Sequence, residues 1–210
     1  MQPESEAERE IATGTDEVRC TVVRRVARVE LHRPEARNAL TLDMKRALVD
    51  LLPVLAADAQ VGCVLLTGAG AAFCAGGDTR KMADDGRPPD PAARIAQLRW
   101  EHRIPAALHR MPKPTLAALP GPAAGAGFAL ALACDLRVLS EHAFVTTAYV
   151  RLGLSGDYGA SWFLTRLVGP ARAREILFLG ERIGASDCAR LGLANRVVPH
   201  DVLEEEAFAL

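Results

Sequence analysis

The pattern of apolar and polar residues predicts strands and helices that alternate along the chain. Short apolar runs rich in β-branched residues predict strands, at 18–24, 26–31, 61–67, 115–119, 136–139 and 196–198. Helical spacing of apolar residues predicts helices among them, at 42–57, 91–110, 125–134, 161–167 and 171–179. Strands that alternate with helices predict an α/β fold.

Local signals predict where these helices begin and break. Thr41 is a good N-cap for the first long helix, and Ser186 is placed to cap a short helix near the end. Pro105 predicts a kink or break within 91–110, because proline removes a helical hydrogen bond. The Gly169-Pro170 pair predicts a second break, between the two helices of 161–179.

The organisation along the chain predicts one domain with a short segment at each end. Residues 1–16 are polar and acidic at their start, so we expect a disordered tail. The core is expected at 17–200, and 201–210 begin a C-terminal helical segment. That segment reaches residue 210 without a capping or stop signal, so we expect that a C-terminal part of the natural protein is missing.

Composition narrows the class of protein. The chain has 210 residues, of which 50% are hydrophobic, and a net charge of −1, which is ordinary for a soluble globular domain. This charge gives no reason to expect nucleic acid or membrane as a partner. The five cysteines are widely spaced in apolar contexts, so we expect reduced thiols, a cytoplasmic location and no metal site.

Two glycine-rich segments carry the chemical signal, and each follows an apolar strand. They are LLTGAGAAFCAGGD at 65–78 and TLAALPGPAAGAGFALALACD at 115–135. Small residues let backbone N–H groups approach a ligand closely. Two such segments can direct two N–H groups at one oxygen, as in an oxyanion hole. Asp157, in GLSGDYG, adds a carboxylate that can move a proton, so the chain is predicted to act on an activated carbonyl compound.

Other interpretations of the first glycine segment are weaker. A dinucleotide-binding fingerprint needs Gly or Ala at its sixth position, where this chain has Phe73. No Gly-Lys-Ser/Thr follows the glycines, so a phosphate-binding loop is not indicated. A purely structural turn is the usual role of a single glycine-rich loop, but here two occur.

The chain resembles the crotonase superfamily, the enoyl-CoA hydratase/isomerase family, from about Val18 to the end. The resemblance rests on HRPEARNAL, AFCAGGD, KPTLAALPGPAAGAGFALALACD and the segment from RLGLSGDYG to ANRVV, in that order. It implies a ββα spiral core with surrounding helices, and substrates that are coenzyme A thioesters. No cofactor beyond the coenzyme A of the substrate is implied, and homotrimers or dimers of trimers are expected.

The same resemblance assigns roles to particular residues. The backbone N–H groups of Gly77 and Ala126 are implied to be the oxyanion donors, and this fits Ala126 at the start of a buried helix. Substrate contacts are expected at Tyr149, which lines the acyl pocket, and at Ala39, Cys74, Ala75, Gly76 and Gly125. Arg33, Arg37 and Lys113 are candidate contacts for the coenzyme A phosphates, although each also fits ordinary surface charge.

The acid–base residues depart from the pattern of the family's hydratases. The two glutamates that add water fall here at Ala129 and Tyr149, so the usual hydration machinery is absent. Asp157 occupies a third position, where similar isomerases use an aspartate to shuttle protons and a dehalogenase uses one as a nucleophile. A single carboxylate beside an enolate suffices for a 1,3 proton shift. The structural alternative is that Asp157 caps the next helix or closes a turn.

The prediction is therefore an acyl-CoA enzyme that stabilises a thioester enolate, with double-bond isomerisation through Asp157 favoured. Three alternatives stay open: enoyl-CoA hydration proper, acyl-CoA hydrolysis or hydrolytic carbon–carbon cleavage, and non-catalytic acyl-CoA binding. The absence of both glutamates motivates the last of these.

Overall fold

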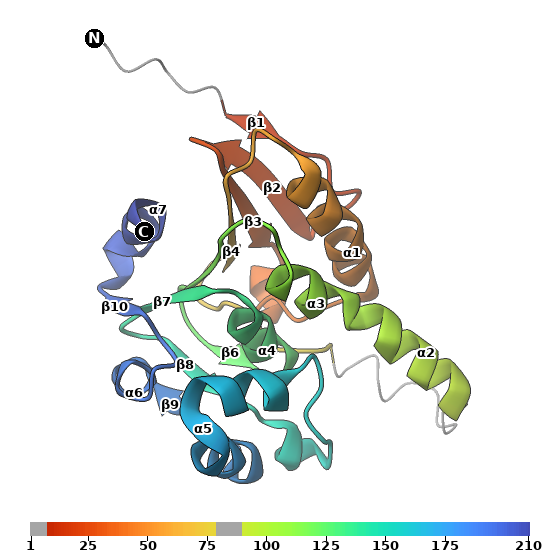
Figure 1. The fold of residues 1–210 in the computed structure, drawn as a ribbon, viewed down its shortest axis with the longest axis vertical. Coiled ribbons are helices and arrows are strands. Elements are labelled where there is room, and N and C mark those ends of the chain that lie inside the picture. The colour runs from red at the N-terminus through yellow and green to blue at the C-terminus, as the bar shows by residue number, and fades with distance from the viewer. Residues whose placement is uncertain (1–7, 79–89) are drawn as a thin grey trace.

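The computed structural model describes residues 8–78 and 90–210. Its largest sheet has seven strands in the order β1-β2-β3-β4-β5-β7-β10 (Figure 1). The first three strands are antiparallel and the others parallel. Their bounds are Arg9–Glu10 (β1), Val18–Val23 (β2), Val26–Leu31 (β3), Cys63–Gly68 (β4), Thr115–Leu119 (β5), Leu136–Ser140 (β7) and Arg196–Val198 (β10).

A second, three-stranded sheet gives the fold its spiral character. Its strands are β6 (Ala123–Ala124), β8 (Phe144–Thr146) and β9 (Ile183–Gly184), in the order β6-β8-β9. The chain passes from β5 in the large sheet to β6 in the small one and then into α4 (Ala126–Ala133). It repeats the step through β7 and β8 before α5 (Ala160–Leu179). Two strands and a helix are thus the repeating unit, and the predicted α/β spiral core is confirmed.

The remaining helices pack around these sheets. Thr41 caps α1 by accepting a hydrogen bond from the Met44 N–H, as predicted, and α1 buries the apolar stripe that contains Leu48, Leu52 and Leu55. The other elements are η1 (Pro34–Ala36), α1 (Leu42–Ala57), α2 (Pro91–Glu101), α3 (Arg103–His109), η3 (Tyr149–Leu152), α6 (Ala185–Arg190), η4 (His200–Val202) and α7 (Leu203–Ala209).

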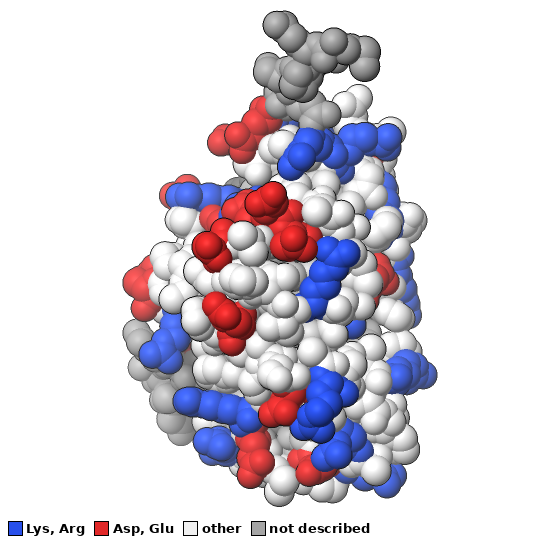
Figure 2. All heavy atoms as spheres, turned by 90° about the vertical axis from the view of Figure 1, so that its left-hand side faces the viewer, with Lys and Arg blue, Asp and Glu red and all other residues white. Residues whose placement is uncertain are grey.

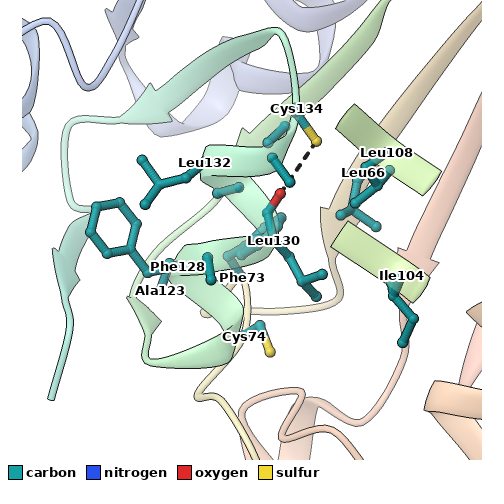
Figure 3. Close-up of a cluster of buried hydrophobic side chains, with 14 of the residues drawn as sticks. Leu66, Phe73, Cys74, Ile104, Leu108, Ala123, Phe128, Leu130, Leu132 and Cys134 are labelled. Atoms are coloured by element: carbon teal, nitrogen blue, oxygen red, sulfur yellow. Dashed lines mark hydrogen bonds between the residues drawn. The ribbon is translucent and has the colours of Figure 1, made fainter. Parts of the chain in front are cut away.

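Helix α4 lies at the centre of the core, and all eight of its residues are buried. Figure 3 shows side chains from three other segments around it: Leu66 of β4, Phe73 and Cys74 of the loop that follows, and Ile104 and Leu108 of α3. Gly127 allows the loop to approach α4 closely, because a Cβ there would lie 2.4 Å from the Cys74 carbonyl oxygen. The first glycine-rich segment is therefore in close contact with α4, which begins within the second glycine-rich segment.

Helix α7 covers the opposite face of the large sheet (Figure 1). Leu203 and Ala207 pack there against Leu65, Leu116 and Val138, whereas Leu66 points to the α4 side. Neighbouring residues of a strand point to opposite faces, so β4 contributes to both apolar clusters. None of the helices in the described ranges is long and apolar enough to span a membrane.

Three expectations about the chain's local structure are wrong. The tail expected over 1–16 is ordered in part, because Arg9 and Glu10 pair with Thr21 and Val22; residues 1–7 lie outside the described residues. The break in 91–110 falls at His102 and not at Pro105. Pro105 is in the first turn of α3, where its missing N–H has no helical partner to lose. Ser186 does not cap α6, which begins one residue earlier without a side-chain cap.

The break predicted at Gly169-Pro170 is confirmed as a kink inside α5. Gly169 has φ +75° and ψ 164°, which is not helical, so the two halves of α5 meet at a kink there.

Figure 2 shows the face of the molecule that carries α7, where basic and acidic side chains are interspersed. The described part of that face therefore has no single sign of charge.

Candidate active site

The two glycine-rich segments meet at the start of α4. A Cβ at Gly76 would lie 2.9 Å from the carbonyl oxygen of Ala124 and 3.6 Å from the nitrogen of Ala126. Gly76 also has φ +94°, a conformation that side chains disfavour. Glycine is therefore required at this position, and the close approach brings Gly77 beside Ala126.

Both predicted oxyanion donors are free of the neighbouring backbone pairings. Gly77 forms an isolated parallel bridge with Leu40, in which the Leu40 N–H donates to Gly76 and the Asp78 N–H donates to Leu40. This pairing turns the N–H of Gly77 itself away from Leu40. Ala126 is the first residue of α4, so its N–H has no carbonyl acceptor within the helix. The helix dipole adds a partial positive charge at the same place.

A cavity of about 90 Å³ joins these donors to Asp157. Most of the residues predicted to form the site line this cavity: Ala75, Gly76, Gly77, Gly125, Ala126, Tyr149 and Asp157. The structure thus brings together residues from three separate parts of the chain.

Two predicted contact residues do not line the cavity. The backbone N–H and C=O of Cys74 are hydrogen-bonded to Pro122 and Ala124, and burial raises the pKa of its thiol to about 12. The N–H of Ala39 donates to Ala36, and its carbonyl accepts from Arg33. The backbone groups of Cys74 and Ala39 therefore hold the loops together, and the substrate contacts expected at these two residues stay predictions.

Of the three cationic candidates for coenzyme A phosphates, two are used inside the fold. The guanidinium of Arg33 pairs with Glu17 and Asp78. Lys113 donates to two carbonyls at the end of α1, those of Leu55 and Asp58. Both side chains therefore stabilise local structure, whereas Arg37 is exposed to solvent.

Asp157 faces the cavity with an unsatisfied oxygen. Its Oδ1 and the hydroxyl of Tyr149 are both buried, and neither forms a well-aligned hydrogen bond with another described residue. The two groups nevertheless line the same cavity, and the Asp157 carboxylate adds to the effect of burial, which raises the pKa of Tyr149. We interpret the pair as close but poorly aligned, as catalytic contacts often are before a substrate binds.

The ionisation of Asp157 is shifted in the direction that proton transfer requires. Burial raises the pKa of this carboxyl, and the negative charge of Glu101 adds to the effect. The Tyr149 hydroxyl, His102 and Lys45 each act to lower the pKa and only partly offset the burial. A raised pKa makes Asp157 a stronger base than an exposed aspartate and lets it carry a proton nearer neutral pH.

The side chain of Asp157 neither caps the next helix nor closes the turn. Helix α5 has Gly159 as its N-cap and no side-chain cap. Only the backbone carbonyl of Asp157 takes part in the turn, by accepting from the Ala160 N–H. A carboxylate with a purely structural role is found elsewhere: Asp135 accepts hydrogen bonds from the N–H and hydroxyl of Thr115, so it joins β5 to the end of α4.

Sequence reasoning missed a second carboxylate in the same cavity. Glu101, the last residue of α2, is 2% exposed and forms a salt bridge of 3.0 Å with Lys45. Both side chains line the cavity. Glu101 precedes Ile104 and Leu108 by three and seven residues, so it occupies an apolar helical stripe. A charged residue on such a stripe was the available signal for a buried, paired carboxylate.

The position that carries a glutamate in the family's hydratases is Ala129 here, which is fully buried inside α4. The groups that line this cavity include no carboxylate from α4. Among the residues described, no three His, Cys, Asp or Glu side chains are grouped so as to hold a metal ion. The carboxylates that line the cavity are therefore those of Asp157 and Glu101, with Tyr149, Tyr158 and Lys45 beside them.

Comparison with known proteins places this geometry in a family. The family described as Enoyl-CoA hydratase/isomerase matches residues 22–210. A probable enoyl-CoA hydratase of Mycobacterium leprae is 37% identical over 88% of this chain and 64% of its own length. A 1,2-epoxyphenylacetyl-CoA isomerase of Escherichia coli is 35% identical over 88% of this chain and 71% of its own length.

A third relative is a 4-chlorobenzoyl coenzyme A dehalogenase of an Arthrobacter species, 36% identical over 82% of this chain and 62% of its own length. The chain thus spans roughly two thirds of the length of these curated relatives. The crystal structure of a putative enoyl-CoA hydratase from Streptomyces coelicolor covers all of this chain, at 34% identity and a TM-score of 0.88. The match covers 76% of that structure. The chain belongs to the enoyl-CoA hydratase/isomerase family, within the crotonase superfamily.

Proposed function

We propose that the chain acts on coenzyme A thioesters and moves a double bond within the acyl group. The observation that carries the proposal is that Gly77, Ala126 and Asp157 line one cavity. Two backbone donors and a partly buried carboxylate are the groups that an enolate intermediate needs. Coenzyme A enters as part of the substrate, and no further cofactor is required.

The N–H groups of Gly77 and Ala126 would hold the thioester carbonyl oxygen. Negative charge develops on that oxygen when a proton leaves the neighbouring α-carbon. Donors fixed in the backbone need no reorganisation at that moment, and losing one such donor typically costs about 3–4 kcal/mol of transition-state stabilisation. The N-terminal end of α4 adds a favourable partial charge.

Asp157 would carry the proton. As a carboxylate it takes a proton from the α-carbon of a 3-enoyl thioester, and the C–H electron pair forms the enolate. The protonated carboxyl then returns the proton to the γ-carbon, so that the double bond moves from the β,γ to the α,β position. No water is consumed, which fits a chain that has Ala129 and Tyr149 at the positions where the family's hydratases have glutamates.

The test is a panel of 2-enoyl-, 3-enoyl- and dienoyl-CoA thioesters with the wild type and Asp157→Asn. We expect Asp157→Asn to lower turnover of the isomerised thioester by about 10²- to 10⁴-fold, because proton transfer is lost. Equilibrium binding of the thioester should change little, because the backbone donors remain. Steady-state kinetics and calorimetric binding measure the two quantities.

The matched control is Asp135→Asn, which removes a carboxylate that accepts two hydrogen bonds from Thr115 far from the cavity chemistry. It should lower stability by about 1–3 kcal/mol and leave turnover per folded molecule unchanged. An active Asp157→Asn variant would contradict the assignment of Asp157 as the proton carrier. Water addition, release of free coenzyme A, or tight binding without turnover would instead indicate hydration, hydrolysis or a binding protein.

The homotrimer or dimer of trimers, the cytoplasmic location and the absence of nucleic-acid or membrane partners stay predictions. Light scattering on the purified chain measures the first of these directly.

A further inference from the structure

A buried ion pair forms part of the wall of the cavity that the glycine segments also line. Lys45 of α1 and Glu101 of α2 lie 3.0 Å apart, and their side chains are 14% and 3% exposed. Glu101 also accepts hydrogen bonds from Gln97 at 2.9 Å and from the Tyr158 hydroxyl at 3.3 Å. Three donors therefore converge on one carboxylate that has almost no contact with solvent.

This arrangement fixes the position of the Glu101 carboxylate. Burying a charged group is costly unless it is paired and hydrogen-bonded, and Glu101 has both kinds of partner. Glu101 is thus not free to accept a proton from a substrate, because its oxygens are already occupied. Its contribution to the cavity is a fixed negative charge.

Asp157 is within electrostatic reach of this charge and of the others around it. The groups that face Asp157 come from several elements: Tyr149 of η3, His102 between α2 and α3, Glu101 of α2 and Lys45 of α1. Tyr158 and Arg94 also line the cavity. Tyr158 links the two carboxylates physically, because it follows Asp157 in the chain and its hydroxyl donates to Glu101.

We propose that the Lys45–Glu101 pair is a positioning device that sets the pH range in which Asp157 can exchange a proton with the acyl group. The inference rests on the proposed function, since it concerns the residue assigned to proton transfer there. Glu101 holds a negative charge near Asp157, and Lys45 both fixes that charge and opposes it. The pair also anchors Tyr158 and, through the Tyr158 N–H bond of 3.2 Å to His102, the ring of His102.

A purely structural explanation accounts less well for the pair. A buried ion pair adds little net stability over apolar residues of the same size. This pair stands on the wall of the cavity and not within the apolar core, which is filled by residues such as Phe73, Phe128 and Leu130. Its location is therefore the one at which its charges can act on Asp157.

The experiment is a titration of the Asp157 carboxyl by ¹³C NMR, in the full chain labelled with ¹³C aspartate. The resonance is identified by its loss in Asp157→Asn. Glu101→Gln removes the negative charge, so the titration midpoint of Asp157 should fall by about 0.5 to 1 pH unit. Lys45→Met removes the positive charge, so the midpoint should rise by a similar amount. The ring resonances of His102 are followed in the same samples to separate its titration.

Two further variants control for the loss of any carboxylate and for a single variant that fails to fold. Glu175→Gln removes an exposed carboxylate of α5 and should leave the midpoint unchanged. The double variant Lys45→Gln/Glu101→Gln replaces the ion pair by a neutral hydrogen-bonded pair, so it keeps the test open if a single variant fails to fold. Its midpoint should lie between those of the single variants. Midpoints that do not move, or that move in the same direction in both single variants, would overturn the proposal.

The same variants separate this inference from the proposed function. If the thioester panel gives turnover, the acidic limb of the pH profile of kcat/KM should follow the NMR midpoints, downward for Glu101→Gln and upward for Lys45→Met. If the panel gives no turnover, the proposed isomerisation fails while the NMR titration still decides whether the pair controls Asp157. An acidic limb that stays in place while the NMR midpoints shift would overturn the link to catalysis.

Discussion

One side of the candidate site is formed by backbone groups and the other by side chains. The side formed by Gly76, Gly77 and Ala126 consists of backbone, and it is held by close contacts that only small residues permit. The side formed by Asp157, Glu101 and Lys45 consists of side chains from distant elements, held by charge and hydrogen bonds. The first side depends on shape and the second on ionisation, so they should respond to different changes.

The backbone side should be sensitive to a single added methyl group. Gly127→Ala would place a Cβ 2.4 Å from the Cys74 carbonyl oxygen and 2.6 Å from the Cys74 Cβ. Backbone atoms cannot move aside cheaply, so we expect a loss of stability of about 3 kcal/mol. This loss should outweigh the gain of about 1 kcal/mol in helix propensity. Urea unfolding measures the free energy, and the thioester panel measures the activity.

The control for that variant is Gly62→Ala. A Cβ at Gly62 would meet Arg25 atoms only at the ordinary distance of 3.7 Å, and the residue is outside the site. Its free energy of unfolding should change by less than about 0.5 kcal/mol. Equal losses in the two variants would show that close packing at α4 has no special importance.

The side-chain side should instead show a dependence on pH. Burial raises the pKa of Asp157 in the folded chain above its value in the unfolded chain. The protonated carboxyl is then favoured by folding, so its stabilising effect is complete below the unfolded pKa and is lost as the pH rises through the folded pKa. The amide introduced by Asp157→Asn cannot ionise, so the variant should gain stability relative to the wild type as the pH rises.

We expect this gain to stay below about 1 kcal/mol at pH 7 and to be smaller at pH 3, because Asp157 is only partly buried. Urea unfolding of both proteins at a series of pH values measures it, with Glu175→Gln as a control for a lost surface carboxylate. A wild type that becomes more stable than the variant as the pH rises would contradict a raised pKa.

The contrast also explains what the sequence could reveal. The glycine segments and the strand before each of them are local patterns, so the meeting of the two segments could be anticipated, while the resemblance to the family implied that Gly77 and Ala126 are the donors. The strands at Val18–Val23 and Val26–Leu31 were equally predictable from their β-branched residues. The ends of helices were harder to predict from the sequence. The break between α2 and α3 falls at His102 and not at Pro105, and no local signal marks His102 as the break.

Glu101 and Lys45 illustrate the other limit. They are 56 residues apart in the chain, so no local signal pairs them. The fold brings the end of α2 to Lys45 of α1 at the cavity and makes them a buried pair. Local sequence likewise does not tell which backbone groups the fold uses, such as those of Ala39 and Cys74.

The most direct test of the central claim is a structure of the chain with a saturated acyl-CoA thioester bound. The account predicts that the thioester oxygen lies about 3 Å from the nitrogen atoms of both Gly77 and Ala126. It predicts that the α-carbon of the acyl group lies about 3–3.5 Å from a carboxylate oxygen of Asp157. A thioester oxygen bound elsewhere, or an Asp157 carboxylate turned away from the acyl group, would contradict it.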